Sequence, residues 1–358
     1  MYVFGAMNFD RPDAELDVWL ESFRSQIDEL GAQAAREVIS SGQLRSGDLI
    51  DALEACARGG GKASAQLLDE AATVPAWVDF EQMLPGSKLG LRTPVQSGLA
   101  LVLGSLVESY ASAKGAKVLI RGGRLHSQVI ARLRDTTNFV LQVAAARGPR
   151  PGTPAHRHIV RTRMVHAFVR HGVLKRGDWR EEWGAPINQE DYASTLLAFC
   201  HVYLRCMHAL GVDVTDEEER SVHHLYRWVG QVMGVAPELL SATREEERLL
   251  YLHITRRQLH PDDDSRVLAR ALIDALAGRG PLFLPAPALE GLSRQMLGDQ
   301  LADGLDFKRS GRWTHVGRVM PVVSSVQRAA EKLPGMLPRL ESMGEKVARL
   351  VFTRGLNP

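Results

Sequence analysis

The chain has 358 residues, of which 45% are hydrophobic and 24% are charged. This composition is typical of a soluble globular protein, and the length suffices for one large domain or two modest ones with an ample core. The 44 basic and 42 acidic residues give a formal net charge of +2. This balance gives no electrostatic basis for binding nucleic acid.

The cysteines and the N-terminal segment limit the class of protein further. Cys56, Cys200 and Cys206 form no disulfide framework and no C-x-x-C pair. The N-terminal segment lacks a charged region followed by an apolar one, and the best apolar run, residues 99–107, falls well short of a membrane span. We therefore expect no secretory signal, no transmembrane segment and a cytoplasmic location.

Hydrophobic periodicity predicts helices throughout the first 75 residues. A helix starts at residues 12–15 and carries apolar positions as far as Ile27, and further helices are expected over 47–57 and 63–72. The glycine-rich stretch between the last two departs from a phosphate-binding loop, because Cys56 and Ala63 stand where such a loop has Gly and Ser or Thr. We interpret this stretch as a connector.

Cap signals predict the next three helices. Thr93 and Pro94 are expected to begin a mostly apolar helix that ends near Lys114. Residues 117–123 are expected to form a break, and the following helix is expected over 123–146. A further helix should begin with Thr153 as N-cap and end at Gly172, a natural C-terminal residue.

Beyond this point the chain again predicts only helices. Asn188, with Asp191 three residues later, should cap a helix that continues to about Leu210. Its start, Asn188 and Gln189, is expected to present unpaired backbone N–H groups to an anion. The remaining helices are expected over 215–233, 237–258, 262–276, 288–302 and 322–351.

The segment RTRMVHAFVRH, residues 161–171, carries the strongest functional signal. Helical spacing places Arg163, His166 and Arg170 on one stripe at the edge of an apolar face. Two nearby cations and partial burial favour neutral imidazole, the form that binds a metal. The arginines are also suited to an anionic group on whatever the imidazole binds. A hydrogen-bonded core histidine is the commoner explanation of such a residue, and it stays open.

Other histidine pairs do not have metal-binding geometry. His156 and His158 are two residues apart, and His223 and His224 are adjacent. On a helix these spacings point the side chains about 200° and about 100° apart, so neither pair is expected to converge on one ion.

Three motifs occur in a fixed order: RLRDTTNFV at 132–140, RMVHAFVR at 163–170 and PINQEDYASTLLAF at 186–199. Together they resemble the family of domains that includes the rubber oxygenase latex clearing protein and the fungal MpaB oxygenase. The resemblance implies an all-α fold with a globin-like helical core, non-covalent haem b and cleavage of isoprenoid C=C bonds with O2. A covalently attached c-type haem is excluded, because C-x-x-C-H is absent.

The resemblance also implies a domain organisation. The globin-like haem-binding core would span residues 75–235. Residues 1–74 would form N-terminal helices packed on this core, and 236–358 a C-terminal helical extension, all as one compact unit.

The resemblance implies roles for five residues. In the family, the histidine of R-x-x-H-A-x-V-R is the proximal iron ligand, which here is His166. An Arg and a Thr that face the haem map to Arg132 and Thr136, the expected catalytic residues near O2. Arg163 and Arg170 are candidates for pairing with the haem propionates.

Two departures from the family pattern leave alternatives open. A glutamate that acts in rubber-cleaving relatives falls by spacing near Ala116, with Glu108 as the nearest upstream acid, and the lysine that precedes the family Thr corresponds to Asp135. We expect a haem b oxygenase that acts with O2 on a small apolar, isoprenoid-type substrate. The alternatives are a haem-binding protein without turnover, such as a gas or redox sensor or a haem carrier, and a helical scaffold without cofactor.

Overall fold

The computed structural model describes residues 13–45, 48–121, 129–145, 148–279, 283–309, 311, 313 and 319–349. Within these residues the elements are helices, and the one β-type pairing is an isolated bridge between Ser112 and Leu259. The prediction of an all-α fold is confirmed. None of the described helices is long and apolar enough to cross a membrane.

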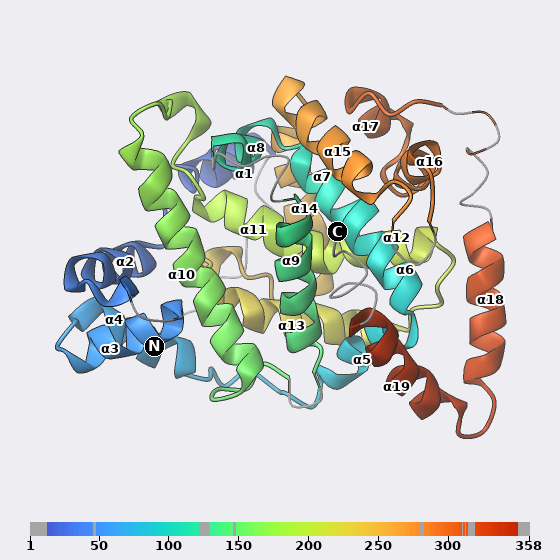
Figure 1. The fold of residues 1–358 in the computed structure, drawn as a ribbon, viewed down its shortest axis with the longest axis horizontal. Coiled ribbons are helices and arrows are strands. Elements are labelled where there is room, and N and C mark those ends of the chain that lie inside the picture. The colour runs from blue at the N-terminus through green and yellow to red at the C-terminus, as the bar shows by residue number, and fades with distance from the viewer. Residues whose placement is uncertain are drawn as a thin grey trace.

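Four helices form the N-terminal part of the chain; the last three lie together at one end of the molecule, beside the long helix α10, and the first lies apart from them (Figure 1). They are α1 (Asp13–Ser22), α2 (Glu29–Ser41), α3 (Leu49–Arg58) and α4 (Lys62–Ala72). The helix expected to carry apolar residues as far as Ile27 ends at Ser22. Residues 23–28 lead to α2, which Asp28 caps by accepting a hydrogen bond from the N–H of Gly31. The glycine-rich connector between α3 and α4 is confirmed.

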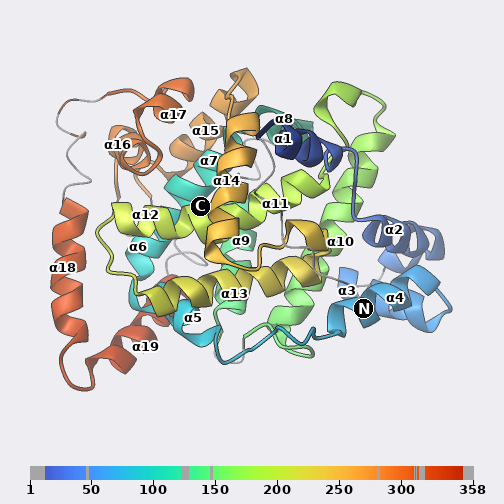
Figure 2. The same cartoon turned by 180° about the vertical axis from the view of Figure 1, so that it is seen from behind.

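The central part of the chain forms the body of the molecule. Its helices are α5 (Leu84–Arg92), α6 (Pro94–Leu99), α7 (Val107–Tyr110), α8 (Ala113–Arg121), α9 (Val129–Val143), α10 (Pro154–Lys175), α11 (Gln189–Leu197), α12 (Tyr203–Ala209) and α13 (Asp216–Met233). Two π segments, η2 (Ala100–Leu106) and η4 (Ala198–Val202), join α6 to α7 and α11 to α12, and they pack against each other. Both views place α9 between α10 and the α6–η2–α7 helix (Figures 1 and 2).

Six further helices surround this body. They are α14 (Arg244–Gln258), α15 (Asp263–Leu276), α16 (Ala286–Leu297), α17 (Asp299–Gly304), α18 (Val319–Glu331) and α19 (Met336–Arg349). The single helix expected over 322–351 is instead the pair α18 and α19. Gly335 interrupts it in the left-handed region, at φ 72°.

Three other boundaries differ from the predictions. Residues 113–121 form helix α8, where a break was expected from residue 117. The helix that carries His166 continues past Gly172 to Lys175. The first part of the helix expected over 123–146 lies outside the described residues, which resume at α9.

Candidate functional site

Helix α10 presents the key stripe to the interior. Thr153 accepts a hydrogen bond from the N–H of His156 at 3.2 Å, and Pro154 occupies the first helical position, as predicted. Ile159, Arg163 and Arg170 are at most 2% exposed. The stripe inferred from helical spacing therefore points into the protein.

His166 is half-buried and makes no hydrogen bond within the described part of the chain. Its Nδ1 is enclosed without a partner, and its ring centroid lies 5.4 Å from that of Tyr192. Burial and then the charge of Arg170 lower the pKa of His166 to about 4, against a smaller opposing effect of Asp28. The imidazole is therefore neutral at physiological pH, which is the form that binds a metal ion.

Arg163 lies one turn before His166 and has other partners. Its guanidinium forms two hydrogen bonds of 2.8 Å with Asp28, one of 2.9 Å with Glu70 and one of 3.3 Å with the carbonyl of Val232. Gly234 permits this approach, because a Cβ at that position would come within 2.6 Å of Arg163 Nε. These contacts favour a structural role, because they use four of the five guanidinium N–H groups and leave one, on Nη2, for the expected pairing of Arg163 with a propionate.

Arg170, one turn after His166, is only partly engaged. Its Nε and Nη2 donate to the carbonyls of Pro186 and Ile187 at 2.9 and 2.7 Å, whereas its Nη1 is buried without a partner. Ile187 has a φ of 54°, an outlier for a β-branched residue. Arg170 thus holds a strained loop and keeps one donor available beside the candidate site.

The start of α11 has its backbone donors occupied, contrary to the prediction of an anion site. Asn188 and Asp191 form a capping box, in which each side chain accepts from the other residue's N–H at 2.9 and 3.3 Å. The N–H of Gln189 donates to the carbonyl of Gln26 at 2.9 Å. The prediction was wrong because a loop far away in sequence, residues 23–28, supplies an acceptor.

Tyr192 and Asp191 are site residues that the sequence did not single out. The Tyr192 hydroxyl is buried without a hydrogen-bond partner, and burial followed by Asp28 raises its pKa. Burial is also the main factor that raises the pKa of Asp191 to about 6. Both residues lie in the PINQEDYASTLLAF motif, but only the packing of α11 against α10 places Tyr192 beside His166.

Helix α9 carries the two expected catalytic residues. Arg132 and Thr136 are half-buried, and Arg132 Nη2 donates to the Tyr110 hydroxyl at 3.4 Å. Among the described contacts, no hydrogen bond or ring contact joins either residue to His166. The structure places α9 beside α10 (Figure 1), and the roles of Arg132 and Thr136 stay predictions.

The position that spacing gives for the family glutamate holds no acid. Ala116 is fully buried on α8. Glu108 is 4% exposed and is committed to Arg205 and Tyr251, whose hydroxyl donates to it at 2.8 Å. Asp135, where the family has a lysine, is exposed.

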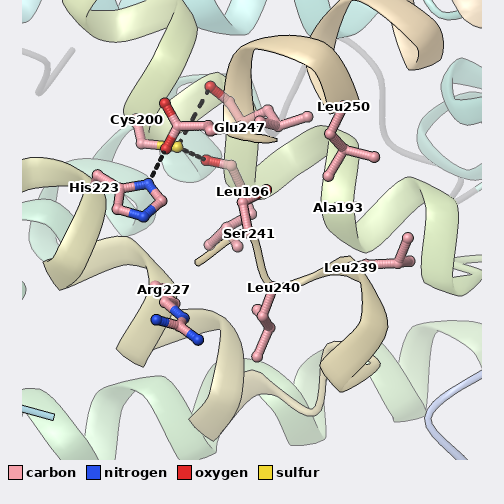
Figure 3. A pocket seen from close by; sticks show the side chains of 11 residues that line it. Ala193, Leu196, Cys200, His223, Arg227, Leu239, Leu240, Ser241, Glu247 and Leu250 are labelled. Atoms are coloured by element: carbon pink, nitrogen blue, oxygen red, sulfur yellow. Dashed lines mark hydrogen bonds and ion pairs between the residues drawn. The ribbon is translucent and has the colours of Figure 1, made fainter. Parts of the chain in front are cut away.

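A second polar cluster surrounds a small cavity between α11, η4, α13 and α14 (Figure 3). His223 Nδ1 lies 2.6 Å from Glu247, which also contacts His201 at 3.6 Å. Although burial opposes it, the interactions with His201 and His223 hold the pKa of Glu247 well below its usual range. Burial and Glu247 raise the pKa of Cys200, so this thiol is protonated and unsuited to nucleophilic chemistry.

The remaining histidines behave as their spacing predicts. His156 Nε2 bonds to the carbonyl of Ala71 at 2.8 Å, whereas His158 contacts the ring of Phe139. His223 faces Glu247 and His224 accepts from the N–H of Asp79. The described residues contain no group of three or more His, Cys, Asp or Glu side chains suited to a metal ion. Any metal held at His166 therefore has to bring its other ligands with it, as in a macrocycle.

Fold and site together define an all-α protein with a neutral, half-buried histidine whose Nδ1 has no hydrogen-bond partner among the described residues. A family model described as "ER-bound oxygenase mpaB/B'/Rubber oxygenase, catalytic domain" matches residues 92–326, which are more than half of the chain. The chain therefore belongs to this family.

Known proteins agree with this assignment. A rubber oxygenase of Streptomyces sp. (strain K30) is 23% identical over 293 residues, which cover 80% of this chain and 71% of that protein. A solved structure of a latex clearing protein in the closed state matches with a TM-score of 0.63 at 20% identity, covering 80% of this chain and 79% of that one. This structural likeness supports the all-α fold.

Proposed function

We propose that this protein is a haem b-dependent oxygenase that acts with O2 on an apolar, isoprenoid-type substrate. One observation carries the proposal: His166 is neutral, and its buried Nδ1 has no hydrogen-bond partner in the part of the chain that the structure describes. Buried polar groups in proteins are normally satisfied, so an unpartnered one indicates a missing ligand. Family membership supports haem iron as that ligand, because iron in a macrocycle needs only one or two protein ligands.

The residues around His166 fit a haem. Arg170 Nη1 is a buried unpartnered donor suited to a propionate. Apolar side chains on η2, α9, α10 and η4 are only partly buried although they pack on the core: Leu101, Val102, Ile130, Val140, Phe168 and Phe199. They leave apolar surface that a porphyrin would cover. The haem, when bound, supplies the O2 chemistry, and the chain supplies ligation, an apolar environment and orientation.

Arg132 and Thr136 are the residues we propose to act during turnover. They share one face of α9, one turn apart, and both keep some exposed surface. A guanidinium and a hydroxyl there can donate hydrogen bonds to negative charge that develops on oxygen. Tyr110 contributes by fixing the position of Arg132.

A second candidate function is haem binding without turnover, as in a sensor or carrier. The specific observation that favours it is the absence of an acid at Ala116, together with the commitment of Glu108 to Arg205 and Tyr251. Without that acid, a proton acceptor near the substrate has to come from elsewhere.

The ligand assignment is tested with an absorption spectrum of the purified protein and a pyridine haemochrome assay. We expect a Soret band at about one haem per chain, which shifts with CO after reduction. His166→Ala should lose the haem, whereas His171→Ala, an exposed histidine on the same helix, should retain it. Full haem occupancy in His166→Ala would contradict the assignment.

Turnover is tested by O2 consumption and product analysis with isoprenoid alkenes. We expect Arg132→Ala to keep its haem but to react more slowly by about ten-fold to a hundred-fold, since one stabilising donor is removed. A haem-loaded protein that yields no product from any alkene would support the sensor or carrier function instead.

A further inference from the structure

Helix α18 directs its polar residues toward the protein. Ser324 is 5% exposed and its hydroxyl donates to the carbonyl of Leu210 at 3.0 Å. Gln96 donates to Ser324 at 3.3 Å and to the side chain of Gln327 at 3.1 Å. The inner face of α18 is thus attached mainly by hydrogen bonds.

Ion pairs complete this attachment. Arg92 contacts Glu331, the last residue of α18, at 2.8 Å, and Arg328 contacts Asp213 at 3.4 Å. Arg92 is 8% exposed. Met320 is the buried apolar side chain of α18, and the other described contacts that fix the position of this helix are polar and leave its valines exposed.

The outer face of α18 is apolar. Val319, Val322, Val323 and Val326 are 58%, 62%, 44% and 67% exposed. Their spacing of three, four and seven residues places them in one stripe along the helix. A surface helix normally turns such a stripe toward the core, so α18 is inverted. Contiguous exposed apolar residues of this kind indicate an interaction surface.

Exposed cationic residues follow the apolar stripe of α18 along the chain. The turn and helix that follow it expose Leu333, at 54%, and Leu337, at 40%. Lys332, Arg339 and Lys346 are exposed there, and none has an ion-pair partner among the described residues. An apolar stripe beside uncompensated cations is the pattern of helices that lie in a membrane interface.

We infer that the pair α18–α19 docks the protein on an anionic lipid surface. The valines would enter the boundary between headgroups and acyl chains, and the cations would contact anionic headgroups. A second copy of the chain fits this surface less well, because a two-fold contact would bring the same unpaired cations together. Figure 1 shows α18 at the edge of the molecule, where a planar surface can reach it. The inference does not depend on haem.

The test is flotation of the full chain with vesicles of phosphatidylcholine plus about one third phosphatidylglycerol, compared with phosphatidylcholine alone. We expect binding to the anionic vesicles that weakens with salt. Val322→Gln with Val326→Gln should lower the partition coefficient at least about ten-fold. Lys332→Gln with Arg339→Gln should lower it by about thirty-fold on anionic vesicles, at about five-fold per cation.

A matched control uses exposed valines elsewhere. Val18 on α1 is 73% exposed and Val267 on α15 is 46% exposed, and changing both to Gln should leave vesicle binding unchanged. All substituted side chains are exposed, so circular dichroism should show folded protein in every variant. Absence of vesicle binding by the parent overturns the inference. An equal loss of vesicle binding in the control variant also overturns it. A third contrary result is a dimer of the parent protein in light scattering that the α18 substitutions dissociate.

Discussion

Arg163 and His166 lie on successive turns of α10 and differ in their hydrogen bonding. Arg163 is nearly fully buried and uses its donors on Asp28, Glu70 and a carbonyl. His166, three residues later, is surrounded by protein and makes no hydrogen bond within the described residues. The guanidinium of Arg163 is mostly satisfied by its own chain, with four of its five N–H groups bonded, whereas the imidazole of His166 is available to a ligand.

The difference separates structural from functional burial. A buried charge is tolerated when partners compensate the loss of water, which explains the Arg163 network. A buried neutral imidazole without partners loses hydrogen bonds and gains none, so it is retained where something else occupies its nitrogen. The sequence stripe alone did not distinguish the two residues, because both have the same periodicity.

The largest expected effect is the loss of stability when the Arg163 side chain is removed. Arg163→Ala should lower the free energy of unfolding by about 3 to 5 kcal/mol, because Asp28 is left as a buried unpaired carboxylate. Urea denaturation measures it. Adding Asp28→Asn, which still can accept from the N–H of Gly31, should restore part of the stability. A loss below about 1 kcal/mol in the single variant would contradict the structural role.

The next effect is the acid sensitivity of His166. Its folded pKa of about 4 lies below the ordinary value of 6.5, so the unfolded chain takes up the proton first. The stability contributed by neutral His166 is full above pH 6.5 and is lost as the pH falls toward 4. At pH 5 the loss should be about 2 kcal/mol. The free energy of unfolding of the apoprotein should vary less with pH in His166→Ala than in the parent protein. Parallel curves for the two proteins would refute the assignment of this pH dependence to His166.

A smaller effect is expected at the start of α10. Thr153 is 4% exposed and its hydroxyl caps the helix at His156. Thr153→Ala should lower the free energy of unfolding by about 1 kcal/mol, while Thr153→Ser should lose less. Haem content per folded chain should stay unchanged in both variants. A loss of haem would mean that the cap, and not only His166, shapes the site.

The smallest effect on stability is expected for the residue of greatest functional interest. His166→Ala should change the free energy of unfolding of the apoprotein at neutral pH by less than about 1 kcal/mol, because no hydrogen bond is removed. Urea denaturation of the apoprotein gives the value. A loss as large as that of Arg163→Ala would make His166 a structural core residue and favour the helical scaffold without cofactor.

Local signals predicted the fold class and the helices around the site. Thr153 and Pro154, and Asn188 with Asp191, marked helix starts correctly, because capping depends on residues within one turn. The predicted end at Gly172 was wrong, since the helix continues through this exposed glycine to Lys175 and buries Val173, whose packing outweighs the low helix propensity of glycine. The family assignment also came from short motifs in fixed order.

The sequence by itself determined an all-α protein, its family and the stripe that contains His166, because periodicity, caps and motifs are local properties of the chain. Tertiary structure decided which members of that stripe are paired. Asp28 is 135 residues from Arg163, and Gln26 closes the start of α11 from a similar distance along the chain. Only folding brings such acceptors together with their donors, and their absence around His166 likewise follows from the packing of distant helices.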